Sequence, residues 1–98
     1  MKKSTGLKKV KTAVFISGRG RNLKNLIKFS NKKNSPIKIN LIISNKKNAK
    51  GLKFAKKSRI EKKIINFTNM KIAEKKILYL LNKKKINFIC LAGFMKIL

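Results

Sequence analysis

The sequence has few of the residues that catalytic and metal sites use most often. Its 98 residues include no histidine, one cysteine and two acidic residues, Glu61 and Glu74, and therefore no aspartate. A zinc site needs several nitrogen, sulfur or carboxylate ligands, and paired acid–base chemistry needs two carboxyl groups in one place. The two glutamates flank a predicted strand, and Glu74 is predicted on a solvated helix face. The sequence therefore supports neither a metal site nor a carboxylate pair.

Cysteine and long apolar runs are also scarce. With a single cysteine, Cys90, an internal disulfide is impossible, and its position in an apolar stretch predicts an inert core thiol with a raised pKa. No apolar run approaches the roughly 20 residues of a membrane span, and no apolar segment of signal-peptide length follows the basic N-terminus. We therefore expect a cytoplasmic protein with no membrane partner.

Negative charge is almost absent, and 28 lysines and arginines give a formal net charge of +26. Such a charge can serve nucleic-acid or other polyanion binding, since a basic surface gains affinity by releasing counterions. However, lysine, isoleucine and asparagine make up about half of the chain, and their adenine- and thymine-rich codons indicate genome bias. The lysines are scattered, and the six phenylalanines and one tyrosine fall mostly at core-like positions, so no stacking platform is predicted. A basic nucleic-acid-binding α/β module remains the alternative hypothesis.

Apolar periodicity predicts an alternation of strands and helices after a basic tail at residues 1–10. The strands are expected at 12–16, 37–43, 63–67 and 86–92, and the helices at 22–32, 52–59 and 70–85. This β-α-β-α-β-α-β order predicts right-handed crossovers and a Rossmann-like parallel sheet in an α/β domain covering residues 11–98. We expect the strand order 3-2-1-4, in which strands one and four are neighbours.

Ligands of open parallel sheets bind outside the carboxyl ends of the strands, where the strand order reverses. Two unusual segments follow strands one and four: a glycine loop at residues 17–22, and Gly93–Leu98. We therefore expect both segments to border one crevice.

The glycine loop favours a single phosphate. It lacks the Gly-Lys-Ser/Thr end of a Walker A motif. Gly18 and Gly20 fit the first two positions of a dinucleotide fingerprint, but Leu23 occupies the third, and the second strand ends without an acid. Backbone N–H groups at the start of a helix attract an anion, and Asn22 can cap that helix or donate to the ligand. A tight strand–helix turn without a ligand is the competing interpretation.

Four segments together resemble one family: residues 16–23, 44–46, 51–52 and 91–98, which read ISGRGRNL, SNK, GL and LAGFMKIL. The family is phosphoribosylglycinamide formyltransferase, the folate-dependent enzyme of purine biosynthesis. The resemblance covers about residues 11–98, which correspond to the N-terminal half of the family's usual length. It implies glycinamide ribonucleotide as the substrate and 10-formyltetrahydrofolate as the formyl donor.

The resemblance also assigns site residues. The segment matching Gly20, Arg21 and Asn22 grips the substrate phosphate, and the segment matching Met95, Lys96, Ile97 and Leu98 lines the folate pocket. Arg21 stands where the family usually has serine, so a backbone contact would survive there and a hydroxyl contact would not. The counterpart of a folate-contacting arginine is Met70 or Lys71.

No catalytic residue is assigned, because the family's catalytic asparagine, histidine and aspartate lie beyond the matched part. Formyl transfer to an amine needs an oxyanion stabilised and a proton removed. We therefore expect a truncated formyltransferase that is inactive alone and whose partner would be the missing C-terminal half. A third hypothesis, a misfolding-prone remnant, follows from the apolar end at Gly93–Leu98.

Overall fold

The fold is known from a computed structural model that describes residues 9–16 and 21–92. Its elements alternate along the chain: β1 (Val10–Ile16), α1 (Arg21–Ser30), β2 (Ile37–Ser44), α2 (Leu52–Lys57), β3 (Glu61–Ile64), α3 (Met70–Lys83) and β4 (Phe88–Ala92). The β-α-β-α-β-α-β order predicted from periodicity is confirmed.

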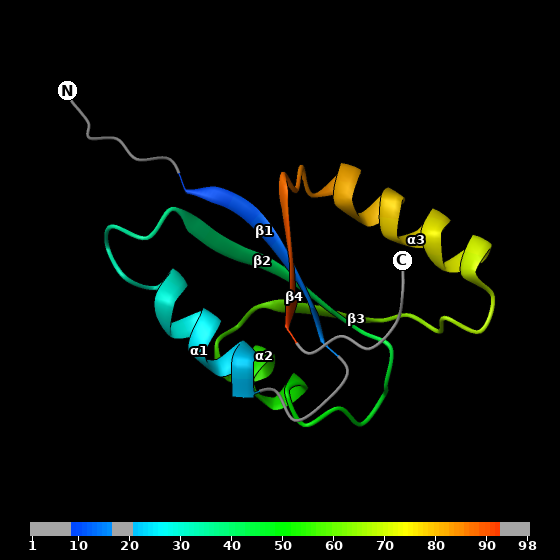
Figure 1. The fold of residues 1–98 in the computed structure, drawn as a ribbon, viewed down its shortest axis with the longest axis horizontal. Helices are drawn as coiled ribbons and strands as arrows, with labels where there is room; N and C mark the ends of the chain where they lie inside the picture. The colour runs from blue at the N-terminus through cyan, green and yellow to red at the C-terminus, as the bar shows by residue number, and fades with distance from the viewer. Residues whose placement is uncertain (1–8, 17–20, 93–98) are drawn as a thin grey trace.

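The four strands form one parallel sheet in the order β3-β2-β1-β4, as predicted. Helices α1 and α2 cover one face of the sheet, and α3 covers the other (Figure 1). Both faces of the central strands are therefore buried, which explains why their sequences are almost wholly apolar.

Two clusters of buried side chains hold the helices to the sheet. On the α1 and α2 side, Val14 and Ile16 of β1 pack with Leu23 and Ile27 of α1. On the α3 side, the intervening Phe15 packs in the same cluster as Ala73 and Ile77, one turn apart on α3. The two-residue period of the strand and the 3.6-residue period of the helices thus explain this three-layer arrangement.

Strand β3 is where the structure differs most from the sequence prediction. The apolar pattern predicted a strand at 63–67, whereas β3 begins at Glu61 and ends at Ile64, paired with Leu41 to Ser44 of β2. All four of its side chains are exposed because β3 is an edge strand. Its sequence is therefore mostly polar, and a prediction based on apolar runs misses it. The buried Ile65 and Phe67 follow the strand and pack under α3.

The ends of the other elements shift by smaller amounts. β1 begins two residues earlier than predicted, at Val10, whereas α1, α2 and α3 end two residues earlier, at Ser30, Lys57 and Lys83. Beyond α2 and α3 the chain enters the left-handed region, at Arg59 (φ 58°) and Lys85 (φ 55°). The next N–H groups reach back to the last helical carbonyls, Ile60 to Ala55 and Ile86 to Leu81. This closure normally uses glycine, so composition alone does not reveal it.

Candidate functional site

The strand order reverses next to β1, and this reversal defines the candidate site. From β1 the chain moves through α1 to β2 on one side, whereas α3 carries it back to β4 on the other. The carboxyl ends of the three strands are in register, because Ile16 pairs with Ser44 of β2 and with Ala92 of β4. In open α/β sheets this edge is where ligands bind.

Helix α1 begins at that edge. The chain leaves β1 at Ile16 and re-enters regular structure at Arg21, so the first turn of α1 lies beside the ends of β1 and β4 (Figure 1). The first N–H groups of a helix have no partner within the helix and carry a partial positive charge. Leu23 is fully buried in the α1-side cluster, which holds this first turn against the sheet.

Asn22 is the predicted phosphate-site residue whose side chain the structure describes. It is exposed, and it lines a hollow of about 440 Å³ together with Asn25, Leu26 and Phe29 of α1 and Leu91 of β4. The structure thus brings the start of α1 and the end of β4 together. Gly20, the side chain of Arg21 and the predicted folate segment Met95–Leu98 lie outside the described residues.

The end of β2 adds polar groups to the same edge. The buried Ser44 Oγ accepts from the Lys46 N–H at 3.0 Å and donates to the Lys46 carbonyl at 2.8 Å, which folds the chain back after the strand. The next side chain, Asn45, has a buried Oδ1 that no donor among the described residues reaches. A buried acceptor without a donor costs about 1–3 kcal/mol, so a ligand hydroxyl or amine reaching it would be stabilised. Sequence reasoning noted the Ser44-Asn45 segment but had no means of finding this free oxygen.

The start of α3 also lies at the carboxyl edge, because α3 follows β3. Met70 packs against the α3-side cluster, whereas the next side chain, Lys71, is exposed. Of the two counterparts of the family's folate-contacting arginine, Lys71 is therefore the accessible one.

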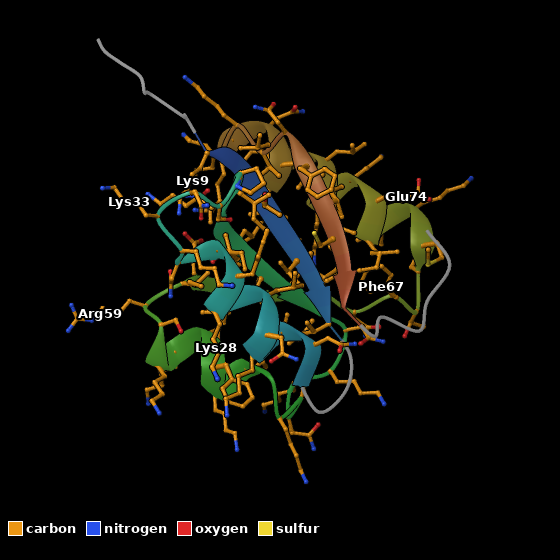
Figure 2. All side chains as sticks on the ribbon, turned by 60° about the vertical axis from the view of Figure 1, so that its left-hand side comes forward. Lys9, Lys28, Lys33, Arg59, Phe67 and Glu74 are labelled. Carbon is orange, nitrogen blue, oxygen red and sulfur yellow. The ribbon has the colours of Figure 1, made fainter. Side chains whose placement is uncertain are left out.

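A larger hollow lies at the opposite edge of the sheet. It measures about 530 Å³ and is lined by Lys9, Lys38, Arg59 and Glu61, among others. Lys9 and Arg59 lie on this side of the molecule, away from Phe67 at the carboxyl edge (Figure 2).

This larger hollow is a poor anion site despite its basic residues. The carboxyl-terminal ends of α1 and α2 border it, and helix C-termini carry partial negative charge. Lys9 Nζ already donates to the carbonyls of Ser30, at 2.6 Å, and Lys32, at 2.8 Å. We therefore place the candidate site at the carboxyl edge, in the smaller hollow.

The two acids of the chain do not form a pair. Glu61, at the start of β3, forms ion pairs with Lys84 and with Lys63. The hydrogen bond from Lys84 lowers the pKa of the Glu61 carboxyl below its ordinary value. Glu74 is exposed on α3, as predicted. Within residues 9–16 and 21–92, no cluster of three potential metal ligands is present and no helix is long and apolar enough to cross a membrane.

Cys90 is a poor nucleophile in this setting. Its half-buried side chain packs against the α1-side cluster, and burial raises the pKa of the thiol. The raised pKa agrees with the sequence prediction and lowers the fraction of reactive thiolate at neutral pH, whereas the half-buried position is not the core position that was predicted.

The predicted placement of the aromatic residues was partly wrong. Phe15 and Phe67 are buried, but Phe29, Phe88 and Tyr79 are 42%, 49% and 62% exposed. These exposed rings come from three different elements, α1, β4 and α3. Exposed lysines occur on all three helices and on β1, β2 and β3, so no single basic stripe accompanies the rings.

The comparison with known proteins agrees with this geometry. The family model described as formyl transferase matches residues 10–98. The human trifunctional purine biosynthetic protein adenosine-3 is 39% identical over 94 residues, covering 93% of this chain and 9% of that protein. Phosphoribosylglycinamide formyltransferase of Haemophilus influenzae is 40% identical over 91 residues, covering 90% of this chain and 43% of that protein.

Solved structures show the same relation. Phosphoribosylglycinamide formyltransferase from Brucella melitensis aligns with a TM-score of 0.87 at 33% identity, over 93% of this chain and 49% of that chain. The enzyme from Anaplasma phagocytophilum aligns with a TM-score of 0.81, also at 33% identity, and is covered to 43%. The chain thus spans less than half the length of these proteins, in their N-terminal part. On the match over residues 10–98, it belongs to the formyl transferase family.

Proposed function

We propose that this chain is the substrate-binding part of a phosphoribosylglycinamide formyltransferase, the enzyme that transfers a formyl group to the amine of glycinamide ribonucleotide. The observation that carries the proposal is the start of α1 at the reversal of strand order, beside the ends of β1 and β4. The names of the similar proteins supply the reaction. A purine-pathway role and a cytoplasmic location belong to the same proposal.

Gly20, Arg21 and Asn22 would hold the substrate phosphate. The first N–H groups of α1 donate to an anion at this position without any particular side chain, so serine is not required where Arg21 stands. The exposed Asn22 amide can add a side-chain donor. Asn45 Oδ1 is available at the same edge for a hydroxyl of the ligand.

The formyl donor would be 10-formyltetrahydrofolate, with Met95, Lys96, Ile97 and Leu98 lining its pocket. These residues follow β4, which ends at Ala92 beside Ile16, so the segment departs from the same edge as the glycine loop. The exposed Lys71 at the start of α3 is the described side chain that could meet an anionic part of this donor.

These 98 residues would bind substrate without transferring the formyl group. Proton removal from the attacking amine needs a base, and the sequence has neither histidine nor aspartate. Glu61 is held by Lys84 at the amino end of β3, at the edge opposite the site. The catalytic groups would come from a C-terminal half, which is a proposed partner.

Isothermal titration of the 98-residue chain with glycinamide ribonucleotide tests the substrate assignment. At 150 mM NaCl we expect saturable binding by the wild-type chain and binding weakened about tenfold or more in Asn22→Asp, because a carboxylate in the first turn of α1 repels the phosphate. Asn82→Asp is the matched control: it adds the same charge at an exposed position near the end of α3, outside the hollow that Asn22 lines.

Two outcomes would contradict the proposal. One is the absence of binding by a chain that melts cooperatively, and the other is equal weakening by both variants, which would indicate general attraction to +26 charges rather than a site. Measurable formyl transfer by the pure chain would contradict the proposed division of roles.

A further inference from the structure

The larger hollow, at the amino edge of the sheet, has the dimensions of a small-molecule site. Its volume of about 530 Å³ lies within the range of about 300–1,000 Å³ that is typical of ligand pockets. Four elements meet there: the carboxyl ends of α1 and α2, the first half of β2 and the start of β3. None of its lining residues lines the smaller hollow at the carboxyl edge, so the two are separate.

Asn40 occupies an irregular position in β2. Thr12 of β1 pairs with Ile39 of β2, and the next residue, Ala13, pairs with Leu41, so the ladder between β1 and β2 passes over Asn40. The ladder between β2 and β3 begins only at Leu41. An extra residue of this kind is a β-bulge, which redirects a side chain and often lies beside a functional site. Here the redirected side chain is one that lines the hollow.

The side chain of Asn40 lacks a hydrogen-bond donor for its carbonyl oxygen. Its Oδ1 is buried, and no donor among the described residues reaches it. A buried acceptor without a donor destabilises the folded chain. The last side-chain torsion of asparagine is soft, so the amide can rotate toward the hollow at little cost. An N–H group of a ligand in the hollow would therefore supply the hydrogen bond that this oxygen lacks.

The charges around the hollow disfavour ions of either sign. An anion would meet the carboxylate of Glu61 and the partial negative charge of two helix ends, while Lys9 Nζ already donates to two backbone carbonyls. A cation would meet Lys38 and Arg59 in a chain of net charge +26. The hollow therefore favours an uncharged ligand.

The apolar part of the wall suits a flat ring. Ile39 and Ile60 line the same hollow as Asn40, and aliphatic side chains of this kind commonly line ligand pockets. The carboxamide of asparagine can bond an amino group and a neighbouring ring nitrogen at once, as it does with N6 and N7 of adenine. Such a ring would use the oxygen and the nitrogen of the Asn40 amide together.

We propose that this amino-edge hollow is a second binding site, which takes an uncharged nitrogen heterocycle with an amino group beside a ring nitrogen, the edge that adenine presents. Asn40 Oδ1 accepts a hydrogen bond from the amino group, and the Asn40 amide N–H donates to the ring nitrogen. The proposal is independent of the proposed function, because it uses other residues and another ligand.

Titration of the 98-residue chain with adenosine, followed by amide NMR at 150 mM NaCl, tests the site. We expect saturable shifts in the side-chain amide of Asn40 and in the backbone amides of Ile39 and Ile60. Purine riboside is the matched ligand, because it differs from adenosine only in lacking the amino group. It should bind about tenfold more weakly, since it leaves Oδ1 without a donor.

A matched pair of variants locates the hydrogen bond. Asn40→Leu replaces the amide with an apolar group of similar size, so adenosine should bind this variant about tenfold more weakly and no better than purine riboside does. Asn82→Leu makes the same change at an exposed position of α3 outside the hollow, and it should preserve the preference for adenosine. Far-UV circular dichroism and urea denaturation check that both variants fold.

Four results would overturn the proposal. Shifts that do not saturate up to the solubility limit of adenosine, or equal affinity of the wild-type chain for the two ligands, would do so without any variant. A preference for adenosine that survives in Asn40→Leu would do so too, as would adenosine shifts centred on Asn22 and Asn45 at the carboxyl edge. Failure to bind glycinamide ribonucleotide would refute the proposed function and leave this site standing.

Discussion

At the scale of single residues, the chain has so few acids that the effect of each glutamate on stability can be measured separately. Glu61 accepts a hydrogen bond from Lys84 and lies 3.8 Å from Lys63 Nζ. The contact with Lys84 joins the amino end of the edge strand β3 to the residue just after α3.

The pH dependence of stability should report this contact. The pKa of Glu61 in the folded chain is lowered from its ordinary value of 4.5, so its stabilising effect is present above pH 4.5 and is lost as the pH falls through the folded value. We expect Glu61→Gln to lower the free energy of unfolding at pH 7 by about 0.2–1 kcal/mol, the range of exposed ion pairs. Urea denaturation between pH 3 and 7 measures it.

Glu74→Gln is the control for that measurement, because it makes the same change of charge at an exposed position of α3. The difference between the two variants should shrink as the pH falls below 4.5, because protonation of Glu61 removes its ion pairs. A difference that stays constant from pH 7 to pH 3, or that is absent at pH 7, would show that the contact of Glu61 with Lys84 does not stabilise the fold.

At the scale of elements, the left-handed residue that follows a helix lowers the free energy of unfolding, and a substitution at that residue can raise it again. Lys85 has a φ of 55° directly after the end of α3, a region that disfavours any residue with a Cβ atom by about 1–2 kcal/mol. We expect Lys85→Gly to raise the free energy of unfolding by about 0.5–1 kcal/mol, part of the gain being offset by the greater freedom of glycine in the unfolded chain. Chemical denaturation measures the change.

Lys83→Gly removes the same charge within the last turn of α3 and should lower the stability by about 1 kcal/mol, since glycine is a poor helix former. If both substitutions changed the free energy of unfolding in the same direction, the left-handed conformation at Lys85 would not be a source of strain.

The elements also show which features of this fold are readable from sequence. β1 and β2 are buried on both faces and therefore stand out as apolar runs, and α3 stands out through Ala73 and Ile77 on one face. β3 was misplaced because an edge strand needs no apolar residues. The exposure of Phe88 and Leu91 could not be predicted, because a buried central strand and an uncovered apolar edge have the same local sequence.

The same limit applies to the site. The reversal of strand order follows from the alternation of elements, so the carboxyl edge and Asn22 could be anticipated. The Asn45 Oδ1, which has no donor among the described residues, and the hollow shared by Phe29 and Leu91 depend on packing between elements far apart in sequence. No local pattern contains that information.

At the scale of the whole molecule, charge opposes folding. With 28 basic and two acidic residues, the compact state brings like charges close together. We expect the melting temperature of the chain to rise by several degrees, about 4–8 °C per kcal/mol gained, between 10 and 200 mM NaCl, as screening weakens this repulsion. A melting temperature that is flat or falls over this range, followed by circular dichroism, would show that repulsion does not limit stability.

The measurement that tests the account most directly is a map of where glycinamide ribonucleotide binds on the 98-residue chain. Amide NMR shifts recorded at 150 mM NaCl, with ribose 5-phosphate as a reference for the phosphate alone, distinguish the two edges of the sheet. We expect shifts centred on Asn22, Leu23 and Asn45 at the carboxyl edge. Shifts centred on Lys38, Asn40 and Arg59 around the larger hollow at the amino edge, or shifts spread evenly over the lysines, would contradict it.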